Sequence, residues 1–248
     1  MDNKKRIKFM DYNLDALTME ETVFCIQEMI RDNKTCQHVV LNAGKVVMAN
    51  RTPKLRKIIN QCELINADGQ SIVWMARLLG QKVPERVTGI DLMDRILAMA
   101  EKNGYGVFLF GAREEVLKQA ITNIRRKYPA LVVAGQRNGY FTEEQLPDII
   151  QKMKSSRAKI LLVGISSPTK EYWLKDNMSK IDIPFCMGVG GSFDVAAGAA
   201  RRAPVMFQKM GMEWLFRLIQ EPRRMWKRYL FGNINFLLYI IKFKLHRS

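Results

Sequence analysis

Short apolar runs alternate with longer segments of helical periodicity through most of the chain. The runs are continuous rather than alternately apolar and polar, which is typical of strands that are buried on both faces of a parallel sheet. This order predicts an α/β fold, with a Rossmann-like, mainly parallel sheet and helices on both faces. Strands are expected at residues 38–42, 62–66, 106–111, 131–135, 159–164 and 185–190, and helices at 45–60, 71–79, 114–128, 143–154 and 169–178.

Polar and glycine residues directly follow the predicted strands. In an open parallel sheet, ligands bind beyond the carboxyl ends of the strands. The residues just after the strands are therefore the candidates for a binding site: Asn42, Asp68, Gly111 and residues 138–140, 166–170 and 190–194.

Asp68 lies between a predicted strand and a predicted helix, and it allows two interpretations. A structural one is an N-cap, whose carboxylate accepts a backbone N–H and complements the helix dipole. A chemical one is a carboxylate at the mouth of a site, acting as a general base. Arg86, in the polar stretch PERVTGIDL (84–92), is available to an anion or to an ion pair with Asp68, and Thr88 or Asp91 can cap the next helix.

The segment GVGGSFD (188–194) has the glycine density of a nucleotide-binding loop. It is not a complete dinucleotide fingerprint, because Phe193 stands where a third glycine is required. We interpret it as a turn that lets a nucleoside approach the backbone, with Asp194 available to the base or ribose. The preceding segment GISSPTKE (164–171) feeds a helix whose first N–H groups attract phosphate or hydroxyl groups.

Positive charge is concentrated at the end of the chain. The 248 residues include 40 Lys and Arg against 24 Asp and Glu, a net charge of +16. Residues 201–248 hold eleven basic and two acidic residues, which is +9 of that total. We therefore expect an α/β core at 1–200 and a basic appendage at 201–248.

Basic residues of the appendage alternate with Trp, Phe, Tyr and Leu, at helical spacing after residue 233. A basic amphipathic helix with aromatic residues suits an anionic membrane surface, where each Lys or Arg contributes about 1 kcal/mol. A homo-oligomer interface and a nucleic-acid site are the alternatives, and none of the usual nucleic-acid-binding motifs is present. Basic residues of this segment can also clamp a diphosphate: Arg217, Arg223, Arg224, Lys227 and Arg228. Arg224 and Arg228 are one helical turn apart, as are Arg223 and Lys227.

The sequence has few of the residues that several classes of catalytic and metal sites require. Two histidines and four scattered cysteines disfavour a zinc site and a Ser-His-Asp triad. No Asp-x-Asp triplet is present to hold a divalent ion, so no metal and no cofactor are expected. Since no run of about 18 apolar residues and no leader pattern is seen, we expect a cytoplasmic protein without a spanning helix.

An ordered set of motifs resembles the WecG/TagA/CpsF glycosyltransferases, family 26 in the usual classification. The resemblance runs from about residue 42 to residue 228. The matching pieces are Asn42, ADG (67–69), PERVTGIDL (84–92), YP (128–129), NGYF (138–141), GVGGSFD (188–194), GAARRAP (198–204), EWLFRL (213–218) and EPRR (221–224).

The resemblance implies an inverting, metal-independent transferase that moves a sugar from a UDP-sugar to an undecaprenyl-diphosphate-linked sugar. It also implies peripheral attachment to the cytoplasmic face of the plasma membrane, in cell-surface polysaccharide synthesis. A non-catalytic, nucleotide-binding membrane scaffold is the alternative. The resemblance maps the catalytic residues to Asp68, Arg86, Arg224 and Arg228, and substrate-binding residues to Tyr140, Asp194 and Arg217. From their places after the predicted strands, we also expect Asn42, Lys170, Gly190 and Gly191 to bind substrate.

The chain departs from the pattern of that family at two positions. Many members have Thr two residues before the asparagine, where this chain has Val40. Many have Gly-x-Pro-x-Gln-Glu, in which Lys170 here replaces the glutamine. Both positions fall where sugar contacts are expected, so the donor sugar stays open among N-acetylmannosamine, glucose and uronic-acid types.

Overall fold

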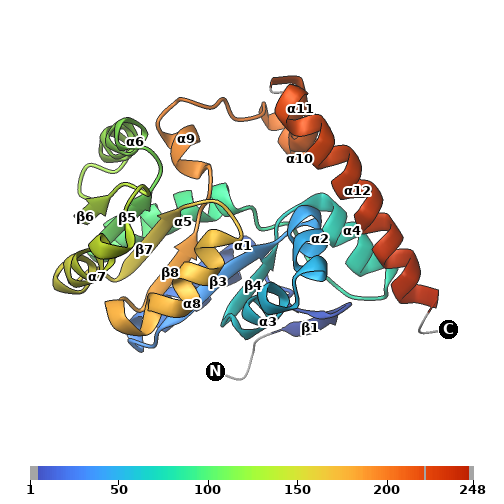
Figure 1. Cartoon of the computed structure of the whole chain (residues 1–248), viewed down its shortest axis with the longest axis horizontal. Helices are drawn as coiled ribbons and strands as arrows, with labels where there is room; N and C mark the ends of the chain where they lie inside the picture. The colour runs from blue at the N-terminus through green and yellow to red at the C-terminus, as the bar shows by residue number, and fades with distance from the viewer. Residues whose placement is uncertain (1–4, 221, 246–248) are drawn as a thin grey trace.

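The computed structural model describes residues 5–220 and 222–245. Within these residues, the centre of the molecule is a six-stranded parallel sheet in the order β4-β3-β8-β7-β5-β6 (Figure 1). Each strand expected from the sequence is present, with ends shifted by up to two residues, so the predicted sheet is confirmed. The strands are β3 (Cys36–Leu41), β4 (Leu64–Ala67), β5 (Val107–Gly111), β6 (Val133–Arg137), β7 (Ile160–Gly164) and β8 (Phe185–Gly188).

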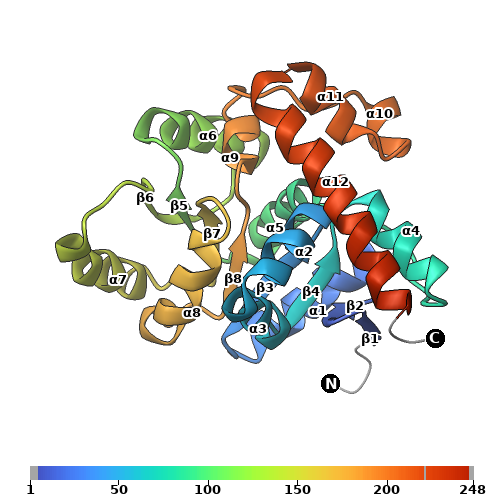
Figure 2. The same cartoon turned by 45° about the vertical axis from the view of Figure 1, so that its right-hand side comes forward.

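The apolar runs form strands because both faces of the sheet are covered by helices, as Figure 1 and Figure 2 show. Every residue of β5 is buried, whereas β6 at the sheet edge is only half-buried. One face packs against α1 (Met19–Arg31), α5 (Gly89–Asn103), α6 (Glu114–Lys127) and α9 (Ser192–Ala196). The other face packs against α2 (Ala43–Arg51), α3 (Pro53–Gln61), α7 (Leu146–Ser155) and α8 (Thr169–Ile181). Helix α4 (Gln70–Leu78) lies beside edge strand β4, and a short 3-10 turn, η1 (Glu143–Gln145), precedes α7.

The single helix expected at residues 45–60 is wrong. The structure has two helices there, α2 and α3, which meet at Thr52. Pro53 causes the break, because proline lacks an N–H group and its ring clashes with the preceding turn.

An N-terminal hairpin of β1 (Arg6–Phe9) and β2 (Tyr12–Asp15), like helix α1, lies outside the sequence expectations. Its strands are too short to show a clear periodicity, and their burial depends on distant residues. Asp15 pairs with Arg6 at 2.7 Å and accepts the backbone N–H of Ile65 at 2.7 Å. The first contact joins β1 to β2 within the hairpin, and the second attaches the hairpin to β4.

The C-terminal part of the chain forms α10 (Val205–Lys209), α11 (Glu213–Gln220) and α12 (Pro222–Leu245). Helix α12 runs beside α2 in both views (Figure 1, Figure 2) and buries Phe236 and Ile240 against the core. Gly232 and Asn233 do not interrupt this helix, since α12 continues through both residues. A glycine inside a helix costs about 1 kcal/mol, and the packing of the two buried side chains outweighs that cost.

No helix among residues 5–220 and 222–245 is both long and apolar enough to cross a bilayer.

Candidate active site

Predicted site residues follow several strands at the carboxyl end of the sheet. Asp68 follows β4, Asn42 follows β3, Gly190 follows β8 and Tyr140 follows β6. The chain leaves β3 toward β4 and leaves β5 toward β6, in opposite directions along the sheet. In open α/β sheets, such a reversal marks the crevice, beyond the carboxyl ends of the strands, in which ligands bind.

The N-cap interpretation of Asp68 is wrong, because Gly69 occupies the N-cap of α4. Gly69 has φ +133°, a conformation that residues with side chains rarely adopt. The backbone N–H of Asp68 donates to the carbonyl of Leu41 at 2.8 Å, which ties the segment to β3. The role of Asp68 as a base stays a prediction.

Asn42 has a structural role that its sequence context did not reveal. Its Oδ1 accepts the backbone N–H of Lys45 at 2.9 Å and caps α2. A Cβ placed on Gly69 would lie 3.7 Å from the Cβ of Asn42. The ends of β3 and β4 therefore bring Asn42 close to the Asp68 segment.

A buried ion pair joins the first turns of α2 and α8. Lys45 Nζ donates to Glu171 Oε1 at 2.7 Å, and the two side chains are 6% and 2% exposed. Ser167 Oγ donates to the same oxygen at 2.9 Å. Burial by itself raises the pKa of Glu171, but the charges of Lys45 and Lys170 and the hydrogen bonds outweigh burial and lower it.

Sequence reasoning did not single out Lys45 or Glu171. Each follows a predicted strand, and Glu171 is also the last residue of the segment GISSPTKE (164–171), where it matches the final Glu of the family pattern Gly-x-Pro-x-Gln-Glu. Their partnership spans 126 residues, which no local pattern reveals.

Lys170 and Gly190, both predicted to bind substrate, are brought together. The buried stem of Lys170 crosses Gly188, where a Cβ would lie 2.8 Å from its Cδ and Cε. Its Nζ lies 3.4 Å from the position that a Cβ on Gly190 would occupy. The glycines of the β8–α9 loop therefore make room for the lysine.

Phe193 explains why the loop is not a dinucleotide fingerprint. Its ring is fully buried, and a Cβ on Gly164 would lie 2.3 Å from it. The aromatic side chain fills the core between β7 and α9, where the fingerprint would have a third glycine.

Tyr140 and Asp194, the predicted nucleoside contacts, share a neighbour in Arg113. A side-chain hydrogen bond to Tyr140 is the main cause that raises the pKa of Arg113, and the charges of Tyr140, Glu115 and Asp194 add to it. Tyr140 is 67% exposed, and its backbone N–H donates to Asn138 Oδ1 at 3.0 Å. Arg113, the residue before α6, was not among the predicted site residues.

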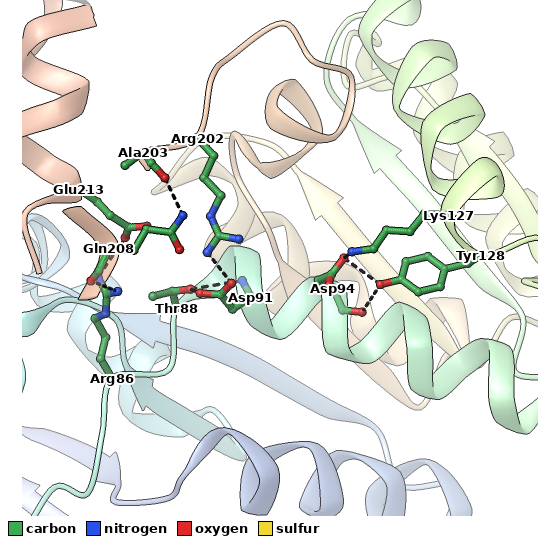
Figure 3. A network of polar contacts seen from close by, with 10 residues as sticks. All are labelled: Arg86, Thr88, Asp91, Asp94, Lys127, Tyr128, Arg202, Ala203, Gln208 and Glu213. Atoms are coloured by element: carbon green, nitrogen blue, oxygen red, sulfur yellow. Dashed lines mark hydrogen bonds and ion pairs between the residues drawn. The ribbon is translucent and has the colours of Figure 1, made fainter. Parts of the chain in front are cut away.

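Arg86 connects the core to the C-terminal helices (Figure 3). Its Nη1 lies 3.0 Å from Glu213 of α11, and its Nη2 donates to the carbonyl of Gln208 at 2.9 Å. The anion that the sequence analysis left open for Arg86 is thus a carboxylate of the chain itself.

A second ion pair reinforces this connection. Arg202 pairs with Asp91, whose other oxygen accepts the hydroxyl of Thr88 at 2.5 Å (Figure 3). Thr88 in turn caps α5, so of the two residues proposed as caps Thr88 is confirmed. A Cβ on Gly211 would lie 2.7 Å from the Cβ of Gln70, which places the α10–α11 turn against the start of α4. The C-terminal helices thus lie over the segment that contains Asp68.

Three predicted arginines belong to these helices, but their side chains lie outside the described part of the structure. They are Arg217 of α11 and Arg224 and Arg228 of α12.

Glu213→Gln is expected to loosen α10 and α11 without unfolding the core. Because the Arg86–Glu213 pair is partly exposed, its loss costs up to about 1 kcal/mol and opens this region locally. Backbone amides of residues 205–220 should then exchange hydrogen roughly two- to fivefold faster. Lys118→Gln, which removes the exposed Lys118–Glu114 pair of α6, is the control and should leave these amides unchanged. Equal exchange in Glu213→Gln and the wild type would refute the role of the pair.

A comparison with known protein families finds a match over nearly the whole chain. The profile described as "Glycosyl transferase WecG/TagA/CpsF family" matches residues 7–248. The match begins in the N-terminal hairpin and extends past α12, so it includes the core and the C-terminal helices alike. The chain therefore belongs to the WecG/TagA/CpsF family, the glycosyltransferases of cell-surface polysaccharide synthesis.

Proposed function

We propose that this protein is an inverting, metal-independent glycosyltransferase that moves a sugar from a UDP-sugar to an undecaprenyl-diphosphate-linked sugar. Family membership supports the reaction class. The arrangement of these residues along the carboxyl end of the sheet is the observation that supports the proposal best. Asp68 follows β4, the strand at one side of the sheet. The cluster of Arg113, Tyr140 and Asp194 lies toward the other side, which ends in β6. A donor in the crevice between them would present its sugar to the carboxylate and its nucleoside to the cluster.

In the proposed reaction, Asp68 takes the proton of the acceptor hydroxyl. The hydroxyl oxygen attacks the anomeric carbon from the face opposite UDP and forms the new glycosidic bond. The bond between that carbon and the diphosphate oxygen breaks, and UDP leaves with the electron pair. The configuration at the anomeric carbon is inverted, and the proton stays on Asp68 until it is lost to water.

Arginines would stabilise the charge that develops on the leaving diphosphate. We assign this role to Arg224 and Arg228, with Arg217 nearby in the substrate site. Arg86 would orient a phosphate or the sugar. A guanidinium has five N–H donors, so Arg86 can hold Glu213 and contact substrate at the same time.

The other predicted residues would line the crevice. Asn42 and Lys170 would contact the sugars, and Gly190 and Gly191 would let the nucleotide approach the backbone. Tyr140 and Asp194 would hold the nucleoside. No cofactor takes part in this proposal.

We further propose that residues 1–200 form the catalytic core and that residues 201–248 dock on an anionic membrane at its cytoplasmic face. Large apolar side chains are exposed along α10, α11 and α12, among basic residues. Such a surface suits the interfacial region of a bilayer, where the lipid-linked acceptor resides. A second copy of the chain is the alternative partner for it. The exposed residues are Val205, Met206, Met210, Trp214, Ile219, Trp226, Ile234, Leu237, Leu238, Ile241 and Leu245.

The double variant Leu238→Glu/Ile241→Glu is expected to bind anionic vesicles at least about tenfold more weakly, since burying each side chain contributes roughly 1.5–3 kcal/mol. Cosedimentation with phosphatidylglycerol vesicles measures this. Phe24→Glu changes an equally exposed residue on α1, across the sheet from α12, and should bind like the wild type. Equal binding by all three proteins would contradict docking through α12.

Release of UDP tests the proposed reaction directly. UDP-sugars are supplied with and without an undecaprenyl-diphosphate-linked sugar, and with EDTA present. We expect release that depends on the acceptor and survives EDTA. Binding of UDP without release from any donor would favour the alternative, a non-catalytic scaffold, which the departures at Val40 and Lys170 leave open. Competition by DNA rather than by UDP would indicate a nucleic-acid-binding protein.

A further inference from the structure

Helix α12 is bonded to the turn between β1 and β2, near the other end of the chain. Tyr239 of α12 donates its hydroxyl proton to Asp11 Oδ2 at 2.5 Å, across 228 residues. The same oxygen accepts from Nη1 of Arg56 in α3 at 3.0 Å. One carboxylate therefore joins the N-terminal hairpin, α3 and the last turns of α12, which lie beside each other in Figure 2.

The turn that carries Asp11 holds this carboxylate in a defined place. Because Phe9 pairs with Tyr12, the turn consists of Met10 and Asp11 alone. Met10 has φ +52°, and the first position of such turns is usually glycine, asparagine or aspartate. A residue with a larger side chain persists in this conformation only where its surroundings hold it. Asn60 of α3 does so in part, since it donates to the carbonyl of Asp11 at 2.8 Å.

The bond to Asp11 adds a direction to the apolar packing of α12. Phe236 and Ile240 hold the helix against the core, but apolar contacts are not directional. A hydrogen bond prefers a defined angle. Burial and the neighbouring carboxylate raise the pKa of Tyr239, so the phenol keeps its proton and donates it. At its other end α12 contacts α11, which pairs with the core through Glu213.

Small changes in the direction of α12 displace its first turns by large amounts. At about 1.5 Å per residue, Arg228 and Arg224 lie roughly 16 and 22 Å from Tyr239 along the helix axis. A rotation of about 10° about Tyr239 would therefore move these two positions by roughly 3–4 Å. Where reacting groups must be aligned, a displacement of about 1 Å can reduce the rate 10²-fold. The angle of α12 thus sets where its arginines act.

We propose that Asp11 and Tyr239 are positioning residues for the transfer reaction, because they fix the direction of α12 so that Arg224 and Arg228 reach the donor diphosphate. The proposal rests on the proposed function, which assigns those two arginines to the leaving diphosphate. Asp11 belongs to the hairpin, away from the carboxyl end of the parallel sheet. Loss of its bond to Tyr239 should therefore slow turnover without removing a substrate contact.

Acceptor-dependent UDP release by Tyr239→Phe and Asp11→Ala tests the proposal. Each should lower kcat roughly five- to twentyfold, and the double variant should be no slower than the slower single variant, since all three lack the same bond. The Asp11 carboxylate is partly exposed, so its loss costs little stability, and calorimetric titration should still find about one UDP site per chain. Tyr128→Phe is the matched control. It removes a phenol–carboxylate bond of 2.8 Å to Asp94, between α5 and α6 (Figure 3), and should react at the wild-type rate.

A second comparison separates positioning from a general loss of stability. Arg224→Lys/Arg228→Lys keeps both charges but places them on flexible stems without the planar group, so its turnover depends less on the angle of α12. Adding Tyr239→Phe to this variant should lower kcat by at most about twofold.

Three results would overturn the proposal. The first is a wild-type kcat in both Tyr239→Phe and Asp11→Ala. The second is a fall caused by Tyr239→Phe that is equally large with lysines at positions 224 and 228, because the bond would then act independently of the arginines. The third is the absence of acceptor-dependent release by the wild type, which would refute the proposed function itself, and this inference with it.

Discussion

Asp68→Asn is expected to abolish turnover while leaving the binding of UDP near that of the wild type. The amide keeps the size and hydrogen-bonding capacity of the carboxylate but cannot take a proton from the acceptor hydroxyl. General-base catalysis contributes about 10²–10⁴-fold to a rate, so UDP release should fall by at least about 10²-fold. Acceptor-dependent UDP release and calorimetric UDP binding, measured on the same preparation, check both parts.

The control for this variant is Asp176→Asn on the exposed face of α8, which removes the same charge away from the crevice. It should react at the wild-type rate. Weak UDP binding together with normal turnover in Asp68→Asn would rule out Asp68 as the base. The retained UDP binding matters because Asp68 and the nucleoside cluster follow different, distant strands.

Lys45→Met is expected to lower the free energy of unfolding by about 3–5 kcal/mol, because it leaves the buried Glu171 carboxylate without its partner. Replacing both members with apolar residues, as in Lys45→Met/Glu171→Met, should recover much of the loss, since two charges no longer need burial. Urea unfolding followed by circular dichroism measures both. Lys118→Met, which breaks an exposed pair on α6, should cost about 0–1 kcal/mol.

A double variant as unstable as Lys45→Met would show that the buried residues matter for their shape and not for their pairing. The pH dependence adds a second readout. Because the pKa of Glu171 is lowered by folding, its contribution is complete above the unfolded value of 4.5 and is lost as the pH falls through the folded value. Below pH 4.5 the wild type should therefore lose stability faster than the double variant.

The parallel sheet could be predicted because its signal is local. Strands covered on both faces must be apolar at consecutive positions, and β5 and β7 are such runs. Asn42, Asp68 and Gly190 follow β3, β4 and β8, so the parallel strands place them at the same end of the sheet before any contact is known. The break at Pro53 was also visible in the sequence, since proline rarely continues a helix, and was overlooked.

Contacts between distant parts of the chain could not be predicted. Asp68 looked like an N-cap because caps often follow strands, but the left-handed conformation of Gly69 moves the cap by one residue. The hairpin of β1 and β2 is held by contacts with distant residues, among them its packing on α2 and α3 and the bond from Asp15 to β4. Its short strands carry no periodicity by which to recognise them.

The sequence alone determined the sheet, the end of the sheet at which the candidate site residues lie, and the basic, apolar character of the last helices, because each follows from the spacing of neighbouring residues. Only the tertiary structure decided which charges meet: Lys45 with Glu171, and Arg86 with Glu213 across 127 residues. Ion pairing depends on distance in space and on burial, and neither is set by separation along the chain. The pairs that hold the C-terminal helices over the Asp68 segment therefore emerged only when the chain was folded.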